Sequence, residues 1–226
     1  MLATLEIAYA QAYEDAAGAG DAAGFAAEVL RLSGLLAELL PDEPEVLALA
    51  ALARFAEARR PARLDERGAM TPLSEQDVGQ WRSDLIAEGA GLLDRAADQR
   101  RTGPYQLMAA IHAAHLSRKD TGFTPWADVL ILYDALLKLR PTAVVAVNRA
   151  VALGEAEGAL AGLDALDAAP RDGRLADWLP YQAARAALCR QAGRFDDARQ
   201  ALTRALDLEP PPAERLFLER KLAELG

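Results

Sequence analysis

The two histidines of the chain are its first candidates for chemistry. His112 and His115 lie three residues apart, so a helix would place both imidazoles on one face. Such a pair can bind a transition metal, but a zinc site needs a third and a fourth ligand. The sequence supplies neither a cysteine pair nor an HExxH-type glutamate beside them. We therefore expect no metal and no cofactor, and we interpret the pair as one packed and one half-exposed histidine.

The other reactive side chains also favour structural roles. Cys189, the single cysteine, lies in an apolar helical segment and is interpreted as a buried thiol rather than a nucleophile. Acidic pairs at 42/43, 155/157 and 196/197 lie beside turns, where carboxylates complement a helix dipole. No GxGxxG, GxxxxGK[ST] or GxSxG motif occurs. We predict that the chain is not an enzyme; a histidine-dependent enzyme stays the least favoured reading.

Polar residues that interrupt apolar helices are better candidates for binding. Asn148 and Arg149 interrupt an apolar run, where they either satisfy buried backbone groups or line a groove. A basic cluster at 59–63 either pairs with nearby acids or binds an acidic partner segment. We predict that the main partner surface comprises Tyr105, His115, Tyr133, Asn148 and Arg149. The second surface comprises Arg59, Arg60 and Arg63.

Composition places these residues on helices. Apolar residues make up 52% of the 226 residues and aromatics only 6%, so Ala and Leu, both strong helix formers, dominate the apolar content. The net charge of −9 disfavours direct nucleic-acid binding, which needs clustered cations. No apolar run reaches the roughly 18 residues of a membrane span, and no leader precedes the first helix. Together with the single cysteine, these features predict a cytoplasmic all-α protein.

The apolar pattern divides the chain into helices joined by short breaks. A turn or short β-hairpin is expected near 62–73, and the polar segment 98–103 predicts a boundary between subdomains 1–100 and 101–226. A helix is expected to begin at Ser74 and to be secure from Asp77. The remaining predicted helices cover 2–16, 22–40, 45–59, 104–116, 126–139, 143–153, 180–191 and 213–225.

The second half of the chain contains an internal repeat. Gly154 and Gly193 are each followed by small or apolar residues at the same offsets of five, nine and twelve. The segment GRFDDARQALTRALDLEP (193–210) resembles the second helix of a tetratricopeptide repeat. This resemblance implies antiparallel helix pairs stacked as a degenerate tetratricopeptide-like superhelix, with a capping helix at 213–225.

Six sequence motifs, which follow one another along the chain, resemble those of a larger family. They are ELLPDEPEV (38–46), ARRPAR (58–63), GPYQL…AAI…H (103–115), W…LYDALL (126–137), VNRAVA (147–152) and ERLFLERKLAEL (214–225). These motifs are similar to those of the C-terminal, tetratricopeptide-like extension of extracytoplasmic-function (ECF) RNA polymerase sigma factors. Members of that family carry two domains upstream that bind DNA and polymerase.

The resemblance implies a non-catalytic regulatory domain that acts in transcription initiation by protein contact. Its partner would be the sigma core domains, RNA polymerase or another regulatory protein. The chain departs from the family where an Asn-Glu-Gly-Tyr signature is usual, because it has Ala10-Gln11-Ala12-Tyr13. The alternative is therefore a free-standing tetratricopeptide-type adaptor that is unrelated to RNA polymerase.

Overall fold

The computed structural model of the protein describes residues 22–169 and 175–226. These residues form α- and 3-10 helices and no β-strand, so the prediction of an all-α fold built from stacked helix pairs is confirmed. The predicted helix 2–16 lies outside the described residues. Contacts divide the chain into two compact units, one of residues up to 63 and 72–124, the other of 64–71 and 125–226.

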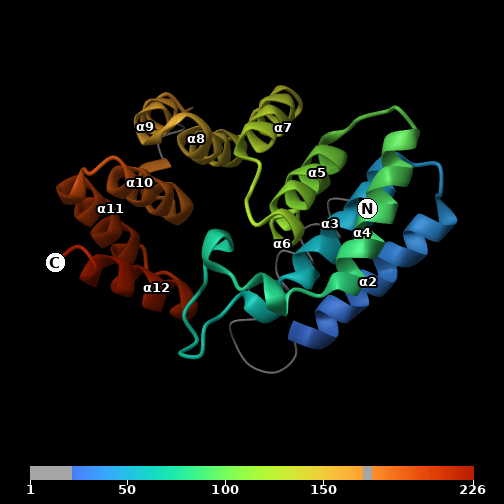
Figure 1. The fold of residues 1–226 in the computed structure, drawn as a ribbon, viewed down its shortest axis with the longest axis horizontal. Coiled ribbons are helices and arrows are strands. Elements are labelled where there is room, and N and C mark those ends of the chain that lie inside the picture. Colours follow the sequence, from blue (N-terminus) through green and yellow to red (C-terminus); the bar gives the residue numbers. More distant parts are fainter. Residues whose placement is uncertain (1–21, 170–174) are drawn as a thin grey trace. The chain divides into compact units, whose positions relative to one another are not determined.

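The first unit is built around α3 (Pro44–Ala58). Helix α3 packs against α2 (Ala22–Leu39), α4 (Ser83–Asp98) and α5 (Pro104–Leu116) (Figure 1). Nearly every residue of α3 is buried because helices surround it, and Phe55 is only 1% exposed. The Phe55 ring packs against the backbone of α4 at Gly89, where a Cβ atom would lie 2.5 Å from the ring.

The boundary predicted near residue 100 falls inside this first unit, because α5 packs on both α3 and α4. Residues 98–103 therefore form a connection between two packed helices. Glu45 of α3 strengthens the junction, since its carboxylate accepts hydrogen bonds from the backbone N–H groups of Tyr105 (2.9 Å) and Gln106 (3.1 Å). This contact satisfies two of the donors that the first turn of α5 leaves open.

The prediction of a helix that begins at Ser74 is wrong. Residues 72–82 form two 3-10 turns, η2 (Leu73–Glu75) and η3 (Val78–Gln80), and α4 begins only at Ser83. Two basic residues of the short helix α6 (Arg118–Thr121) keep this segment from forming a regular helix. Arg118 donates to the carbonyls of Leu73, Ser74 and Gln76, and Lys119 donates to those of Val78 and Trp81. These carbonyls accept hydrogen bonds from side chains instead of from the backbone N–H groups of a regular helix.

The second unit is an array of helices that pack in sequence. Each contacts the next: α7 (Trp126–Leu139), α8 (Ala143–Glu157), α9 (Ala159–Asp167), α10 (Leu179–Gln191), α11 (Phe195–Asp207) and α12 (Pro212–Ala223). A 3-10 turn, η4 (Leu175–Asp177), precedes α10. The bounds of α7 agree with the predicted helix 126–139.

The repeat is less regular than its glycines predict. Gly193 does form a turn, with a φ of 72°, but Gly154 lies inside α8, and the turn to α9 falls at Gly158 with a φ of 112°. Gly154 instead allows a close helix crossing, because its Cα lies 2.7 Å from where a Cβ on Gly162 would be. Since α8 continues to Glu157, Glu155 and Glu157 end a helix rather than begin one.

The expected hairpin near 62–73 is a tight loop of the second unit. Leu64 and Met70 form one isolated antiparallel bridge. Asp65 organises the loop by accepting from the backbone of Arg67 and Ala69, both at 2.9 Å. Two further contacts attach it to α12, one from Met70 N to the carbonyl of Ala213 (2.9 Å) and one between Asp65 and Arg220 (2.9 Å).

Candidate functional site

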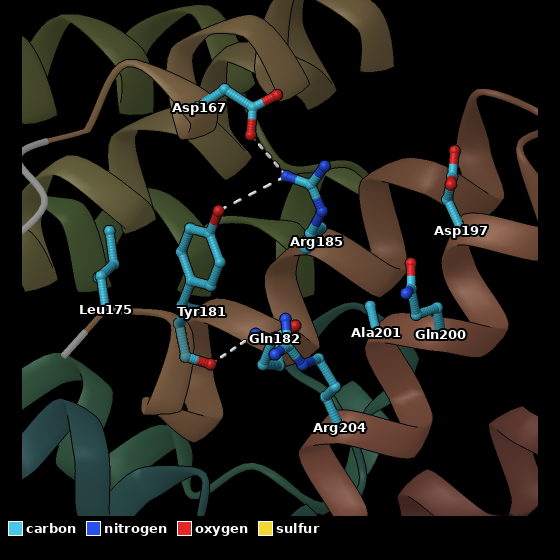
Figure 2. Close-up of a pocket in the computed structure, with 10 residues that line it drawn as sticks. Asp167, Leu175, Tyr181, Gln182, Arg185, Asp197, Gln200, Ala201 and Arg204 are labelled. Atoms are coloured by element: carbon cyan, nitrogen blue, oxygen red, sulfur yellow. Dashed lines mark hydrogen bonds and ion pairs between the residues drawn. The ribbon is translucent and has the colours of Figure 1, made fainter. Parts of the chain in front are cut away.

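The candidate site is a cavity of about 360 Å³ in the second unit, bounded by the end of α9, by η4 and by α10 and α11 (Figure 2). Its volume lies within the usual range for ligand sites, roughly 300–1,000 Å³. Six of its ten lining residues are charged or carry an amide. The lining comprises Asp167, Leu175, Ala176, Tyr181, Gln182, Arg185, Asp197, Gln200, Ala201 and Arg204.

Helix α10 supplies the first wall through its opening turns. Pro180 lies at the first turn, where a missing N–H costs nothing, and Tyr181, Gln182 and Arg185 follow on the side facing the cavity. Gln182 is only 3% exposed, and its Nε2 donates to the carbonyl of Ala176 at 2.6 Å. This bond fixes η4 against α10 and holds the glutamine side chain in place.

Arg185 connects this wall to α9. Its Nη1 donates to Asp167 at 2.5 Å and to the Tyr181 hydroxyl at 3.5 Å (Figure 2). Burial by itself would lower the pKa of Arg185, but the hydrogen bond and the charge of Asp167 raise it. The guanidinium therefore stays charged at the cavity wall, already joined to one carboxylate.

Helix α11 supplies the facing wall. Asp197, Gln200, Ala201 and Arg204 recur at the spacing that places side chains on one helix face. Ala201 is buried and lets the helices approach, while Asp197 is held by Arg194 at 2.7 Å. Arg204 extends from α11 toward α10 (Figure 2) and forms no ion pair within the described part of the chain. It is the cation of this wall that no carboxylate neutralises.

The lining is rich in groups that form hydrogen bonds. No Ser, Cys or His is found among the described residues that line the cavity. Nor do residues 22–169 and 175–226 contain a group of three or more His, Cys, Asp or Glu that could hold a metal ion. The walls do present two amide groups, two guanidinium groups and the Tyr181 hydroxyl, all of which can form directional hydrogen bonds with a ligand.

The partner surface predicted from sequence lies elsewhere. Tyr105 and His115 belong to the first unit, whereas Tyr133, Asn148 and Arg149 belong to the second. Arg149 on α8 pairs with Asp134 on α7 at 2.5 Å, so it fastens two neighbouring helices. None of these five residues lines the cavity. Their role in partner binding stays a prediction.

The basic cluster 59–63 lies at the end of α3. Arg59 is only 7% exposed and its Nη2 lies 3.1 Å from His112 Nδ1, whereas Arg60 pairs with Glu57 at 2.6 Å. Arg63 follows as the C-cap of the 3-10 turn η1 (Arg60–Ala62). A partner segment would therefore meet Arg60 and Arg63, which are half-buried, more readily than Arg59.

The two histidines share the buried environment of Arg59. Burial, followed by the charge of Arg59, lowers the pKa of His112 well below its usual value. The same causes lower the pKa of His115 to about 4. Both imidazoles are thus neutral near pH 7. Cys189 is fully buried, and burial raises the pKa of its thiol, which agrees with its interpretation as a structural residue.

The residues that form the cavity were missed by sequence reasoning, which followed the apolar stripe of each helix. Gln182 and Arg185 flank the stripe of α10, and Gln200 and Arg204 flank that of α11. A signal was available. The polar residues of the two helices of one repeat, read together instead of singly, face the same gap.

Comparison with known proteins places the chain among uncharacterized relatives. Residues 1–97 match the Family of unknown function (DUF6596). The chain is similar to an uncharacterized protein of Rhizobium meliloti (strain 1021), with 38% identity over 207 residues, which are 92% of this chain and 48% of that protein. The chain therefore spans about half the length of this curated relative. No solved structure matches.

Within residues 22–169 and 175–226, no helix combines the length and the apolar character that crossing a bilayer requires.

Proposed function

We propose that the chain is a non-catalytic protein-interaction domain that regulates an ECF-type RNA polymerase sigma factor. The observation that carries the interaction role is the polar cavity between α10 and α11, whose lining offers hydrogen-bonding groups but no Ser, Cys or His. Stacked helix pairs expose such gaps between neighbouring helices, and arrays of this kind commonly use them to hold partners. The polar lining of the cavity therefore supports a role in recognition.

The link to a sigma factor rests on the sequence. Six phrases that run in order from Glu38 to Leu225 resemble the extension of ECF sigma factors, and they span both units of the structure. The net charge of −9 supports a protein partner over DNA, because phosphate backbones repel an acidic surface. The domain would then act on transcription initiation by contacting the sigma core or the polymerase.

The alternative is a free-standing adaptor with no affinity for RNA polymerase. The departure at Ala10–Tyr13 favours it, because a signature usual at the start of the extension is replaced there. The adaptor would use the same cavity for a different protein. The two functions differ in partner and not in the chemistry of the site, so they are separated by a binding experiment.

Calorimetric titration of the full chain with a purified two-domain ECF sigma core tests the proposal. We expect a Kd in the micromolar range or tighter. An unrelated DNA-binding protein of similar net charge serves as the control and should not bind. If the folded chain binds neither protein, the sigma-factor role is wrong and the adaptor function takes its place. If it binds both equally, the interaction is non-specific electrostatic attraction and the sigma-factor role is likewise rejected.

A further inference from the structure

We propose that the cavity between α10 and α11 binds an extended peptide segment through a carboxylate, which pairs with Arg204, and through peptide groups, which pair with Gln182 and Gln200. This inference rests on the proposed function in taking the ligand to be part of a protein. It adds the chemical class of the ligand and the residues that would select it.

Arg204 is the group that selects for a carboxylate. The two arginines at the opposite, N-terminal end of α11 are engaged, since Arg194 pairs with Asp197, and Arg199 pairs with Asp196. Asp207 lies three residues after Arg204, at the same spacing as Asp196 and Arg199, yet no ion pair joins Arg204 to Asp207. Within the described residues, the Arg204 guanidinium lines the cavity without a carboxylate partner, so a ligand carboxylate can bind it through two parallel hydrogen bonds.

The two glutamines suit a peptide backbone. Gln182 is only 3% exposed, and its Nε2 is used by the carbonyl of Ala176, which leaves the side-chain oxygen as an acceptor at the cavity wall. Gln200 lies on the facing helix with its amide exposed. A peptide group carries one donor and one acceptor, so an extended segment between the helices can pair with both amides.

The cavity also sets limits on size and charge. A volume of about 360 Å³ accommodates a short segment rather than a folded partner. Leu175, Ala201 and the Tyr181 ring provide an apolar surface for the aliphatic parts of such a segment. Asp167 and Asp197 lie in the same lining, and their charges disfavour a dianionic phosphate more than a singly charged carboxylate.

The carboxylate could be the C-terminus of the peptide or a glutamate side chain, and three synthetic hexapeptides distinguish these sources. The first alternates alanine and glutamate and has a free C-terminus. The second is its C-terminal amide, and the third has glutamine in place of each glutamate but keeps the free C-terminus. Titration of the full chain with each, followed by fluorescence anisotropy of a labelled peptide, gives three values of Kd.

A matched pair of variants assigns the binding to the cavity. We expect Arg204→Gln to weaken binding of the acidic peptide at least tenfold. Arg190→Gln, which removes another exposed arginine, on α10 and outside the cavity, should change the Kd less than twofold. Neither arginine forms an ion pair within the described residues, so both variants should fold as the wild type does. Unchanged thermal unfolding verifies this.

Each outcome decides the proposal. Loss of binding by the amide assigns the C-terminus, loss by the glutamine peptide assigns the side chains, and either supports the inference. Absence of binding by the acidic peptide, or equal binding of that peptide by the wild type and Arg204→Gln, overturns it.

These results stay separate from those for the proposed function. If the sigma core binds the wild type and Arg204→Gln with equal Kd, the interaction role stands but the cavity is not its site. If the acidic peptide binds and the sigma core does not, the cavity assignment stands and the link to the sigma factor falls.

Discussion

Two arginines, one in each unit of this protein, use their charged side chains in opposite ways. In the first unit, Arg118 donates to three backbone carbonyls, those of Leu73, Ser74 and Gln76, and its guanidinium lies 5.2 Å from the centre of the Trp81 ring. In the second unit, Arg204 faces a cavity and forms no ion pair within the described residues. One arginine has its donors occupied by the fold, and the other has them available for a ligand.

This difference shows why residue type alone identifies a site poorly in an all-α protein. Arginines occur along the whole chain, and a cluster such as 59–63 is more conspicuous in sequence than an isolated Arg204. Yet Arg59 is buried beside His112, and Arg60 pairs with Glu57. What distinguishes a binding arginine is the number of donors that the fold leaves unused, and that number depends on contacts between helices.

Replacement of Arg118 should have the largest effect on stability. Arg118→Ala removes three charge-assisted hydrogen bonds and a cation–π contact from the segment 72–82. We expect the free energy of unfolding to fall by about 3 kcal/mol, measured by urea denaturation. Arg204→Ala is the counterpart in the second unit and should change it by less than about 0.5 kcal/mol. Equal losses in the two variants would remove the contrast between the units.

Acid should destabilise the first unit, which contains both histidines. The pKa of His115 is lowered from 6.5 to about 4 by burial and by Arg59 and Arg118. Between these two pKa values, His115 is protonated in the unfolded chain but not in the folded chain. The free energy of unfolding is therefore highest above pH 6.5 and falls as the pH drops toward about 4. We expect a loss of up to about 3 kcal/mol from this group.

Thermal unfolding followed by circular dichroism across this pH range measures the loss. His115→Gln provides the control, because a side chain that does not titrate should flatten the pH dependence relative to the wild type. If the wild type and the variant lose stability in parallel, His115 is not the responsible group, and His112 or carboxylates that protonate in the same range account for the loss.

The second unit depends on close helix packing at glycines, which a pair of alanine substitutions tests. In Gly162→Ala the new Cβ would lie 2.7 Å from Gly154 Cα and 2.8 Å from the carbonyl oxygen of Ala150, both backbone atoms. Backbone cannot rotate away, so α8 and α9 must separate, and we expect a loss of about 2 kcal/mol.

Gly91→Ala in α4 of the first unit is the matched substitution, because nothing lies within 4 Å of its Cβ position. It should raise stability by up to about 1 kcal/mol, since alanine is the better helix former. Differential scanning calorimetry compares the two variants. A gain in stability for Gly162→Ala would contradict the close crossing of α8 and α9.

The sequence predicted the ends of those helices whose boundaries are determined by neighbouring residues in the chain. Helix 126–139 agrees at both ends with α7, because prolines flank it and its apolar residues recur at helical spacing. The start expected at Ser74 was wrong, because residues 72–82 are held by Arg118 and Lys119, about forty positions away in sequence. Local capping signals cannot reveal a contact of that range.

The candidate site was less predictable than the fold for a similar reason. Gln182 and Arg204 acquire their position only when α10 and α11 pack as a pair, and each is unremarkable on its own helix. Gly154 illustrates the same limit, because its role in the helix crossing follows from Gly162 and Leu188 and not from the repeat pattern.

Hydrogen–deuterium exchange of the full chain, with and without a two-domain ECF sigma core, tests whether the sigma core binds at the cavity between α10 and α11. It reports on both units in one experiment. We predict that the sigma core slows exchange in α10 and α11, residues 179–207, and leaves α3 and the 59–63 cluster unchanged. Protection confined to 44–63, or no protection anywhere under saturating sigma core, would contradict the account.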